Sequence, residues 1–307
     1  MDPRPFRTPA APALAALAAL TTAALSVAVP AGPASASDAG PAAVPAAVHR
    51  VAPDLDRRAR AYWTPRRMRA AAPPEAERRD ESAGAPWTRG GLVARSTGRV
   101  FATSAGREQV CSAAVVRAAN RDLVVTAAHC VRPAGGGWAD NWIFVPGYRD
   151  GAGPHGGFTA RRMFVPAAWT RDGDGDHDVA FVALATAGGR HVADVAGAQR
   201  LAFGGPGGRL THVFGYPAAG RFDGERLAYC SGRPVPHRRG LTAGRGLRCG
   251  LPRGVSGGPW LTGLDPGTGA GTVVSVSSFR FSDDPGTLYG PPFGKAVRDL
   301  YARASVS

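Results

Sequence analysis

Ser256 stands in a run of residues with almost no side-chain bulk, Gly-Val-Ser-Gly-Gly over residues 254–258. Glycines beside a serine let the backbone turn sharply and let a substrate approach closely. They also leave backbone N–H groups free to point at one spot, which is the geometry that stabilises an oxyanion when a hydroxyl attacks a carbonyl. A serine alone is a weak nucleophile, so this interpretation requires a histidine base and a carboxylate that orients the base.

His129 is the candidate base among the seven histidines of the chain. It follows the apolar run 123–128 and precedes Cys130, so its imidazole is expected on a rigid strand edge, as a general base requires. Asp178 is the candidate carboxylate because it stands immediately before the apolar run 179–184, which predicts a buried strand. Asp176 is the alternative, although the apolar run does not start directly after it.

The order of the three residues along the chain is His129, Asp178, Ser256, and order distinguishes the serine-hydrolase architectures. Residues 254–258 also fit the G-x-S-x-G elbow of α/β-hydrolases, but that fold places its histidine after the serine, and none follows Ser256 here. A subtilisin order needs an aspartate first, and Asp122 is available. However, the segments beside His129 and Ser256 are predicted as short strands and not as βα units. The order His–Asp–Ser is that of the chymotrypsin-like double barrel.

Three motifs, TAAHC at residues 126–130, DVAF at 178–181 and GVSGGP at 254–259, together resemble the signatures of chymotrypsin-like serine proteases. They are closest in style to secreted bacterial members related to the glutamyl endopeptidases, and the resemblance covers roughly residues 95–300. It implies that Ser256 is the nucleophile, His129 the acid and base, and Asp178 the orienting group. It also implies an oxyanion hole made by the N–H groups of Gly254 and Ser256. The alternative, a core histidine, a strand cap and a plain turn, has to explain three motifs in the same order.

The four cysteines suggest two disulfides, because their number is even and an export signal precedes them. Near neighbours along the chain are Cys111 and Cys130, and Cys230 and Cys249. The first pairing, which the resemblance also implies, would pin the histidine loop to the preceding strand, and the second would brace the serine loop. Free buried thiols or a metal site are the alternatives, but the sequence contains no C-x-x-C spacing, which argues against zinc.

The sequence departs from the trypsin-like pattern just before the nucleophile. Trypsin-like members carry an aspartate there, which receives the ammonium group of a newly cut N-terminus, whereas this chain has Val255, which cannot form an ion pair. We therefore expect the disulfide Cys230–Cys249 and the packing of Trp260 to hold the oxyanion loop instead.

Substrate preference is weakly encoded. Cleavage after Arg or Lys needs an acid about six residues before the serine, where Gly250 stands, and residues 249–255 contain no acid. Arg248 and Arg253 either favour an acidic residue on the acyl side of the substrate or are solvated surface groups. The segment 273–281 is expected to form one pocket wall.

The formal charge is +14, and all but one of the 37 basic residues are arginine. The arginines are scattered and form no stripe interleaved with aromatic residues, which favours composition bias over nucleic-acid binding. We expect a monomer that acts on protein or peptide substrates without a cofactor, metal ion or nucleic-acid partner. Calcium is the alternative for the acidic run Asp172–Asp176, but an EF-hand loop would place a glutamate at its twelfth position, which is Ala183.

Residues 1–36 resemble a signal peptide, with Arg4 and Arg7 before an Ala/Leu-rich stretch and an A-x-A cleavage motif at 34–36. A transmembrane anchor is the alternative, although the alanines and Pro30 make the stretch weakly apolar. The protein is therefore expected to be secreted, with no membrane partner after signal removal. Residues 37–90 are rich in Ala, Pro, Arg and Glu and are predicted to be a largely disordered pro-segment of a zymogen, or a linker, with a short helix over 57–71.

From residue 98 onward, short β-rich runs alternate with turn residues, which predicts an all-β protease domain over residues 91–307. Two antiparallel β-barrels of the six-stranded type are expected, over about 95–190 and about 200–290. Phe293, Val297, Leu300 and Tyr301 recur at helical spacing and predict a C-terminal α-helix over 292–304. The predicted strands are 99–103, 112–116, 123–127, 142–145, 159–165 and 179–184, then 210–216, 226–230, 246–249, 259–264 and 272–281.

The predicted function is that of a secreted serine endopeptidase that works through an acyl-enzyme. The alternatives are a non-catalytic homologue that acts as a binding protein, and an esterase on the same scaffold.

Overall fold

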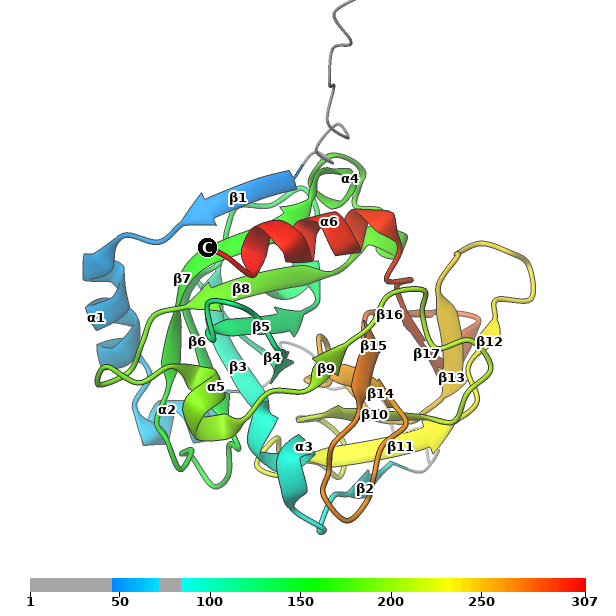
Figure 1. Cartoon of the computed structure of the whole chain (residues 1–307), viewed down its shortest axis with the longest axis horizontal. Helices are drawn as coiled ribbons and strands as arrows, with labels where there is room; N and C mark the ends of the chain where they lie inside the picture. The colour runs from blue at the N-terminus through cyan, green and yellow to red at the C-terminus, as the bar shows by residue number, and fades with distance from the viewer. Residues whose placement is uncertain (1–45, 72–83) are drawn as a thin grey trace, which may run out of the picture. The chain divides into compact units, whose positions relative to one another are not determined.

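The computed structural model describes residues 46–71 and 84–307, all of them within the unit Ala43–Ser307 (Figure 1). The signal peptide predicted over residues 1–36 lies outside the described residues. Among the helices of the described ranges, none has the length and apolarity needed to cross a bilayer.

Six antiparallel strands close into the first barrel, each paired with the next around the ring. Successive residues of one strand, such as Val100 and Phe101, belong to different core clusters, so both faces of the barrel wall are buried. This is why the strands read as continuous apolar runs. In ring order the strands are β3 (Thr97–Ser104), β4 (Arg107–Val115), β5 (Leu123–Thr126), β8 (Ala180–Leu184), β7 (Phe158–Pro166) and β6 (Asp140–Pro146).

The second half forms two sheets around a shared core and not one ring of six strands. Trp260, at the centre of that core, is fully buried. The six-stranded sheet has the order β2 (Ala85–Pro86), β11 (Ala228–Gly232), β10 (Thr211–Gly215), β14 (Pro259–Thr262), β15 (Thr272–Val276) and β9 (Arg200–Leu201). The four-stranded sheet has the order β12 (Val235–Pro236), β13 (Arg245–Arg248), β17 (Asp284–Gly290) and β16 (Phe279–Phe281).

The predicted strand 272–281 is divided because the chain crosses from one sheet to the other at Ser277 and Ser278. The Ser277 N–H donates to the carbonyl of Gly258, in the loop before β14, at 2.9 Å, whereas the Ser278 N–H donates to the carbonyl of Tyr289 on β17, also at 2.9 Å. This crossing places Ser278 beside the first barrel, where it becomes part of the candidate site.

The C-terminal helix α6 (Lys295–Ala304) lies across β7 and β8 (Figure 1). Val297 and Leu300 on this helix are buried, as is Phe293 just before it, which confirms the predicted apolar face. The helix begins three residues later than Pro292, with Gly294 at its N-cap. The remaining helical segments are α3 (Gly91–Ser96), η1 (Ala128–Cys130), α4 (Ala167–Asp172), η2 (Gly175–His177) and α5 (Val192–Ala196).

The prediction of disorder over residues 37–90 is wrong for residues 46–71. These form β1 (Ala46–Arg50), α1 (Pro53–Tyr62) and α2 (Pro65–Ala70), so the helix expected over 57–71 is two helices separated at Pro65. Strand β1 pairs antiparallel with the edge of β7, from Ala46 opposite Pro166 to Arg50 opposite Arg162. Residues 37–45 and 72–83 of the predicted segment lie outside the described residues.

Trp63 and Ala71 fix this N-terminal segment to the barrels. The indole of Trp63 is 3 % exposed, donates from Nε1 to the Asn141 carbonyl at 2.7 Å and packs against Phe101. The Ala71 carbonyl accepts a hydrogen bond from the fully buried guanidinium of Arg99, which also pairs with Glu225 at 3.0 Å. Residues 46–71 are therefore an integral part of the folded protein.

We expect Trp63→Ala to lower the free energy of unfolding by about 3–5 kcal/mol, because it leaves a cavity beside Phe101 and an unpaired Asn141 carbonyl. Urea denaturation of the full chain with its disulfides intact measures this. Leu55→Ala, on the exposed side of α1, is the control and should change the stability by about 0.5 kcal/mol or less. Equal stabilities of the two variants would mean that the segment contributes nothing to the fold.

Candidate active site

His129 lies in the short helix η1, which follows β5 directly. Strand β5 is completely buried between β4 and β8, so its end is fixed, and the turn of η1 brings the imidazole to the surface of the barrel. The disulfide between Cys111 on β4 and Cys130 ties this turn to the neighbouring strand. The histidine is thus held on a rigid edge, as the sequence analysis expects.

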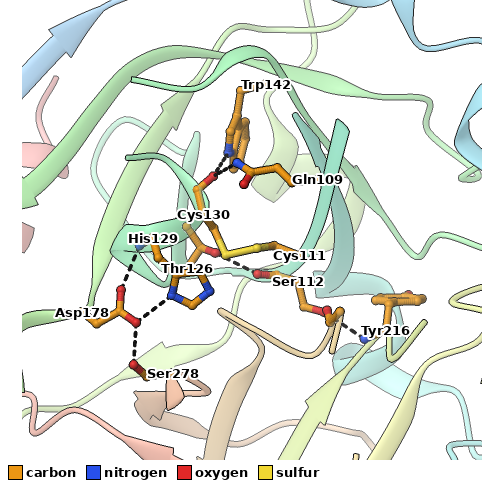
Figure 2. The surroundings of a disulfide bond; sticks show 11 residues. Gln109, Cys111, Ser112, Thr126, His129, Cys130, Trp142, Asp178, Tyr216 and Ser278 are labelled. Carbon is orange, nitrogen blue, oxygen red and sulfur yellow. Dashed lines mark hydrogen bonds and ion pairs between the residues drawn. A yellow bond between two sulfur atoms is a disulfide. The ribbon is translucent and has the colours of Figure 1, made fainter. Parts of the chain in front are cut away.

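Asp178 stands between η2 and β8, and its side chain is only 4 % exposed. Three donors surround its carboxylate (Figure 2). The backbone N–H of His129 donates to Oδ1 at 2.8 Å, the His129 Nδ1 lies 2.7 Å from Oδ2, and the Ser278 hydroxyl donates to Oδ2 at 2.5 Å. The carboxylate therefore orients both the ring and the backbone of His129.

The charges of this pair shift both pKa values. Burial alone would raise the pKa of Asp178, but the charge and hydrogen bonds of His129, with that of Ser278, outweigh it and hold the pKa below its usual 3.8. Burial would lower the pKa of His129, yet the adjacent Asp178 carboxylate raises it above 6.5. The pair is thus an ionised carboxylate beside an imidazole that has become a stronger base.

Ser256 lies in the loop between β13 and β14, on the other side of a cleft of about 630 Å³. His129, Asp178 and Ser256 all line this cleft. The structure therefore brings together the three residues that the motifs single out. Asp176, the alternative carboxylate, does not line it and instead accepts hydrogen bonds from Thr242, Ala243 and Gly244.

Gly254 and Ser256, whose backbone N–H groups are predicted to form the oxyanion hole, both line the same cleft. Within residues 46–71 and 84–307, neither N–H group donates a hydrogen bond. Gly254 has a φ of +99°, and a Cβ atom there would stand 2.5 Å from the Tyr216 carbonyl, so only glycine fits. An anionic oxygen in the cleft would find two donors ready.

The second disulfide, Cys230–Cys249, joins β11 to the residue that follows β13. It connects the two sheets of the second half at the start of the chain segment that leads to Ser256. Both predicted cysteine pairings are present in the structure.

The acidic run at residues 172–176 is a turn between the halves of the molecule. Asp172 pairs with Arg171, and Asp174 accepts hydrogen bonds from the Asp176 N–H and from the His177 ring. Asp176 bonds the loop 242–244. Each of the three carboxylates therefore has a partner within the protein.

The segment 273–281, which the sequence predicts as a pocket wall, contributes Arg280 to the cleft, although the sequence does not single out this residue. Arg280 on β16 lines the cleft, with its guanidinium held by the carbonyls of Leu251 at 2.6 Å and Pro285 at 2.9 Å. Of the two arginines that the sequence leaves as either substrate-binding or solvated groups, Arg253 lines the cleft, whereas Arg248 is not among the lining residues and pairs with Asp284. The arginine at 280 shows no sequence pattern that would identify it, because a bulge between Phe279 and Phe281 sets its direction.

A family model described as a trypsin-like peptidase domain matches residues 111–265 of the chain. In structure the chain is similar to the protease Anisep from Arthrobacter nicotinovorans, at 35 % identity and a TM-score of 0.67, covering 73 % of this chain and all of that one. It is also similar to the thermostable serine protease AL20 from an extremophilic microorganism, at 36 % identity and a TM-score of 0.65, covering 70 % and 99 % of the two chains. A Glu endopeptidase, at 17 % identity and a TM-score of 0.59 over 74 % and 98 %, shares the fold. No curated protein matches the chain in sequence.

The coupling of His129 and Asp178 predicts a pH dependence of stability. The lowered pKa of Asp178 adds stability that is fully present above 3.8 and is lost as the pH falls through the lowered value. The raised pKa of His129 adds stability that is present below 6.5 and is lost as the pH rises through the raised value. Asp178→Asn should therefore lower the free energy of unfolding most between about pH 3.8 and pH 6.5, where both contributions are present. Denaturant titrations of both proteins across this range measure the difference, and a difference that does not vary with pH would contradict it.

Proposed function

Because the chain belongs to the trypsin-like peptidase family and is a serine endopeptidase, we propose that His129, Asp178 and Ser256 are its catalytic triad. The observation that carries this proposal is that the three residues line one cleft, with the Asp178 carboxylate bound to Nδ1 of His129. With Nδ1 occupied in this way, Nε2 is the ring nitrogen left to accept a proton.

The reaction follows from these positions. The Ser256 oxygen attacks the scissile carbonyl while Nε2 of His129 takes the hydroxyl proton, and the carbonyl oxygen becomes an anion that the N–H groups of Gly254 and Ser256 stabilise. The C–N bond then breaks, and His129 passes the proton to the leaving amine. A water molecule then attacks the acyl-enzyme in the same way, with His129 accepting its proton and passing it to the Ser256 oxygen, which restores the hydroxyl. Asp178 stays ionised throughout and stabilises the imidazolium that forms in each half.

Secretion is the second part of the proposal. The signal peptide predicted over residues 1–36 and the two disulfides both suit an oxidising compartment outside the cytoplasm. The substrates are proteins or peptides, which a cleft of this size open to solvent admits as extended segments.

We further propose that the cleft favours an acidic residue on the acyl side of the scissile bond. Arg253 and Arg280 line it, and Asp178, the one acid among the described lining residues, is already bound to His129. A basic substrate side chain would therefore meet positive charge, whereas a carboxylate would meet a charge-assisted donor.

We expect wild-type protein to be labelled by a fluorophosphonate and Ser256→Ala to be unlabelled, with peptide hydrolysis reduced by about 10⁶-fold. Ser231→Ala, which removes an exposed serine on β11, is the control and should behave as wild type. Failure of the wild type to react would favour the non-catalytic binding protein. Hydrolysis of small esters without hydrolysis of casein would favour the esterase.

Arg280→Gln tests the proposed preference. We expect kcat/KM for substrates with glutamate on the acyl side to fall by about 10- to 100-fold, the value of one charge-assisted hydrogen bond, while leucine substrates change little. Arg248→Gln, at an exposed arginine that does not line the cleft, is the matched control. An equal loss of kcat/KM for glutamate and leucine substrates would show that Arg280 does not recognise the charge of the substrate.

A pH profile of kcat/KM tests the roles of His129 and Asp178. Only neutral His129 accepts a proton, so the raised pKa places the acid limb above pH 6.5. In Asp178→Asn, burial becomes the main influence on the pKa of His129 and lowers it, so the acid limb should move to lower pH. The rate should fall by about 10⁴-fold. An unmoved acid limb would mean that another group controls it.

A further inference from the structure

The loop that carries Ser256 needs an anchor that the sequence analysis did not find. Val255, directly before the nucleophile, is 4 % exposed and packs against Gly215, so no ion pair forms there. The Cys230–Cys249 disulfide and the indole of Trp260, which donates to the Ser277 hydroxyl at 3.1 Å, hold the two ends of the loop. The residues between these ends require contacts of their own.

Four consecutive carbonyls of the loop each accept a hydrogen bond. The Arg253 carbonyl accepts from the Ala218 N–H and the Val255 carbonyl accepts from the Gly258 N–H, both at 2.8 Å. The other two carbonyls both bond Ser112: its hydroxyl donates to Gly254 at 2.8 Å, and its backbone N–H donates to Ser256 at 2.7 Å. One residue therefore supplies half of these contacts.

Ser112 is suited to this role by its position on β4 of the first barrel. It is fully buried and adjacent to Cys111, which is bound to the histidine loop through Cys130 (Figure 2). Its hydroxyl also accepts a hydrogen bond from the Tyr216 N–H at 2.8 Å, so the hydroxyl is held both as a donor and as an acceptor. The hydrogen bonds of Ser112 therefore join β4, which is linked to the histidine turn by the Cys111–Cys130 disulfide, to the loop of Ser256.

The orientation of the carbonyls decides the orientation of the N–H groups. In a trans peptide the C=O and N–H bonds point in opposite directions, so fixing the carbonyls of residues 253 and 255 fixes the N–H groups of Gly254 and Ser256. Gly254 lies between these planes with a φ of +99° and has no side chain to restrict it. The bond from Ser112 to the Gly254 carbonyl is the restraint on the plane between them.

We propose that Ser112 is a positioning residue for catalysis, whose hydroxyl keeps the N–H groups of Gly254 and Ser256 directed at the oxyanion. The inference rests on the proposed function and adds to it a mechanical link between the two halves of the site. The link consists of neutral hydrogen bonds and therefore needs no charged chain end to complete it.

Ser112→Ala tests the proposal, because it removes the hydroxyl and keeps the backbone N–H. We expect kcat to fall by about 10- to 100-fold, less than the loss of a whole oxyanion donor, with KM changed by about twofold or less. The inhibition constant of a peptide boronic acid, whose adduct on Ser256 places an oxygen between the two N–H groups, should rise by the same factor as kcat falls. The low-field proton resonance of the His129–Asp178 hydrogen bond should be unchanged.

Two further variants separate positioning from packing. Ser96→Ala is the matched control, because Ser96 is equally buried and its hydroxyl donates to the Leu92 carbonyl at 2.8 Å, on α3. It should lower the melting temperature comparably while kcat stays at the wild-type value. Ser112→Thr keeps the hydroxyl and should retain kcat within about threefold of wild type.

Three results would overturn the proposal: a kcat of Ser112→Ala equal to that of Ser96→Ala, a loss of the low-field resonance together with kcat, or an equal loss in Ser112→Thr. Fluorophosphonate labelling distinguishes this failure from failure of the proposed function. If the wild-type protein is not labelled, the proposed function itself is wrong. If the wild-type protein is labelled and Ser112→Ala has the same kcat as wild type, only the positioning role is wrong.

Discussion

The burial of the Asp178 carboxylate is the constraint on which the site depends. A charge that is 4 % exposed is destabilising unless donors surround it, and here the donors come from distant parts of the chain. His129 supplies two from the end of β5, and Ser278 supplies one from the crossing between the two sheets of the second half. Satisfying one buried charge therefore places the histidine, the carboxylate and a wall of the cleft in fixed relation.

The glycines that follow Ser256 are needed because their loop packs very closely against neighbouring strands. A Cβ on Gly257 would stand 2.1 Å from the Thr126 hydroxyl and 2.4 Å from the Ser112 carbonyl, and one on Gly258 would stand 2.0 Å from the Phe214 carbonyl. Gly257 thus allows the loop to approach the first barrel closely, and Gly258 allows it to approach β10 within the second half. The sequence analysis assigns them to access for the substrate and to a sharp turn, which explains Gly254 but not this packing.

Strands could be predicted from the sequence where both faces of the strand are buried, because such a strand is a continuous run of apolar residues. β5 and β8 are buried along their whole length, so all their residues except Thr126 are apolar, and their positions agree with the prediction. β17 was missed because it begins with Asp284, Pro285 and Gly286, which are typical of turns, and its place depends on pairing with β13. The second half also departs from a single ring because the chain changes sheets at Ser277, and no local pattern reports that change.

The N-terminal segment shows a different limit of sequence reasoning. Its prolines and arginines make its average composition that of a disordered chain, but Trp63 and Met68 bury the few apolar surfaces it has. Within the site, three motifs identified His129, Asp178 and Ser256, since each motif is contiguous. Ser112 and Ser278 make hydrogen bonds to residues far away in the sequence, which only the folded chain reveals.

The kind of contact that holds the loop of Ser256 also determines how the candidate site responds to ionic strength and pH. An ion pair behind the nucleophile would weaken at high ionic strength and would break when either partner changed protonation. Here Val255 is packed in an apolar core, and the carbonyls around it bond neutral donors that do not titrate near neutral pH. In the proposed mechanism, His129 and Asp178 are therefore the groups whose protonation would change the chemistry, while the N–H groups of Gly254 and Ser256 would keep their geometry. Under this proposal, the pH sensitivity of the site would come from His129 and Asp178, and the shape of the oxyanion hole would depend on neutral hydrogen bonds to the loop, two of them from Ser112.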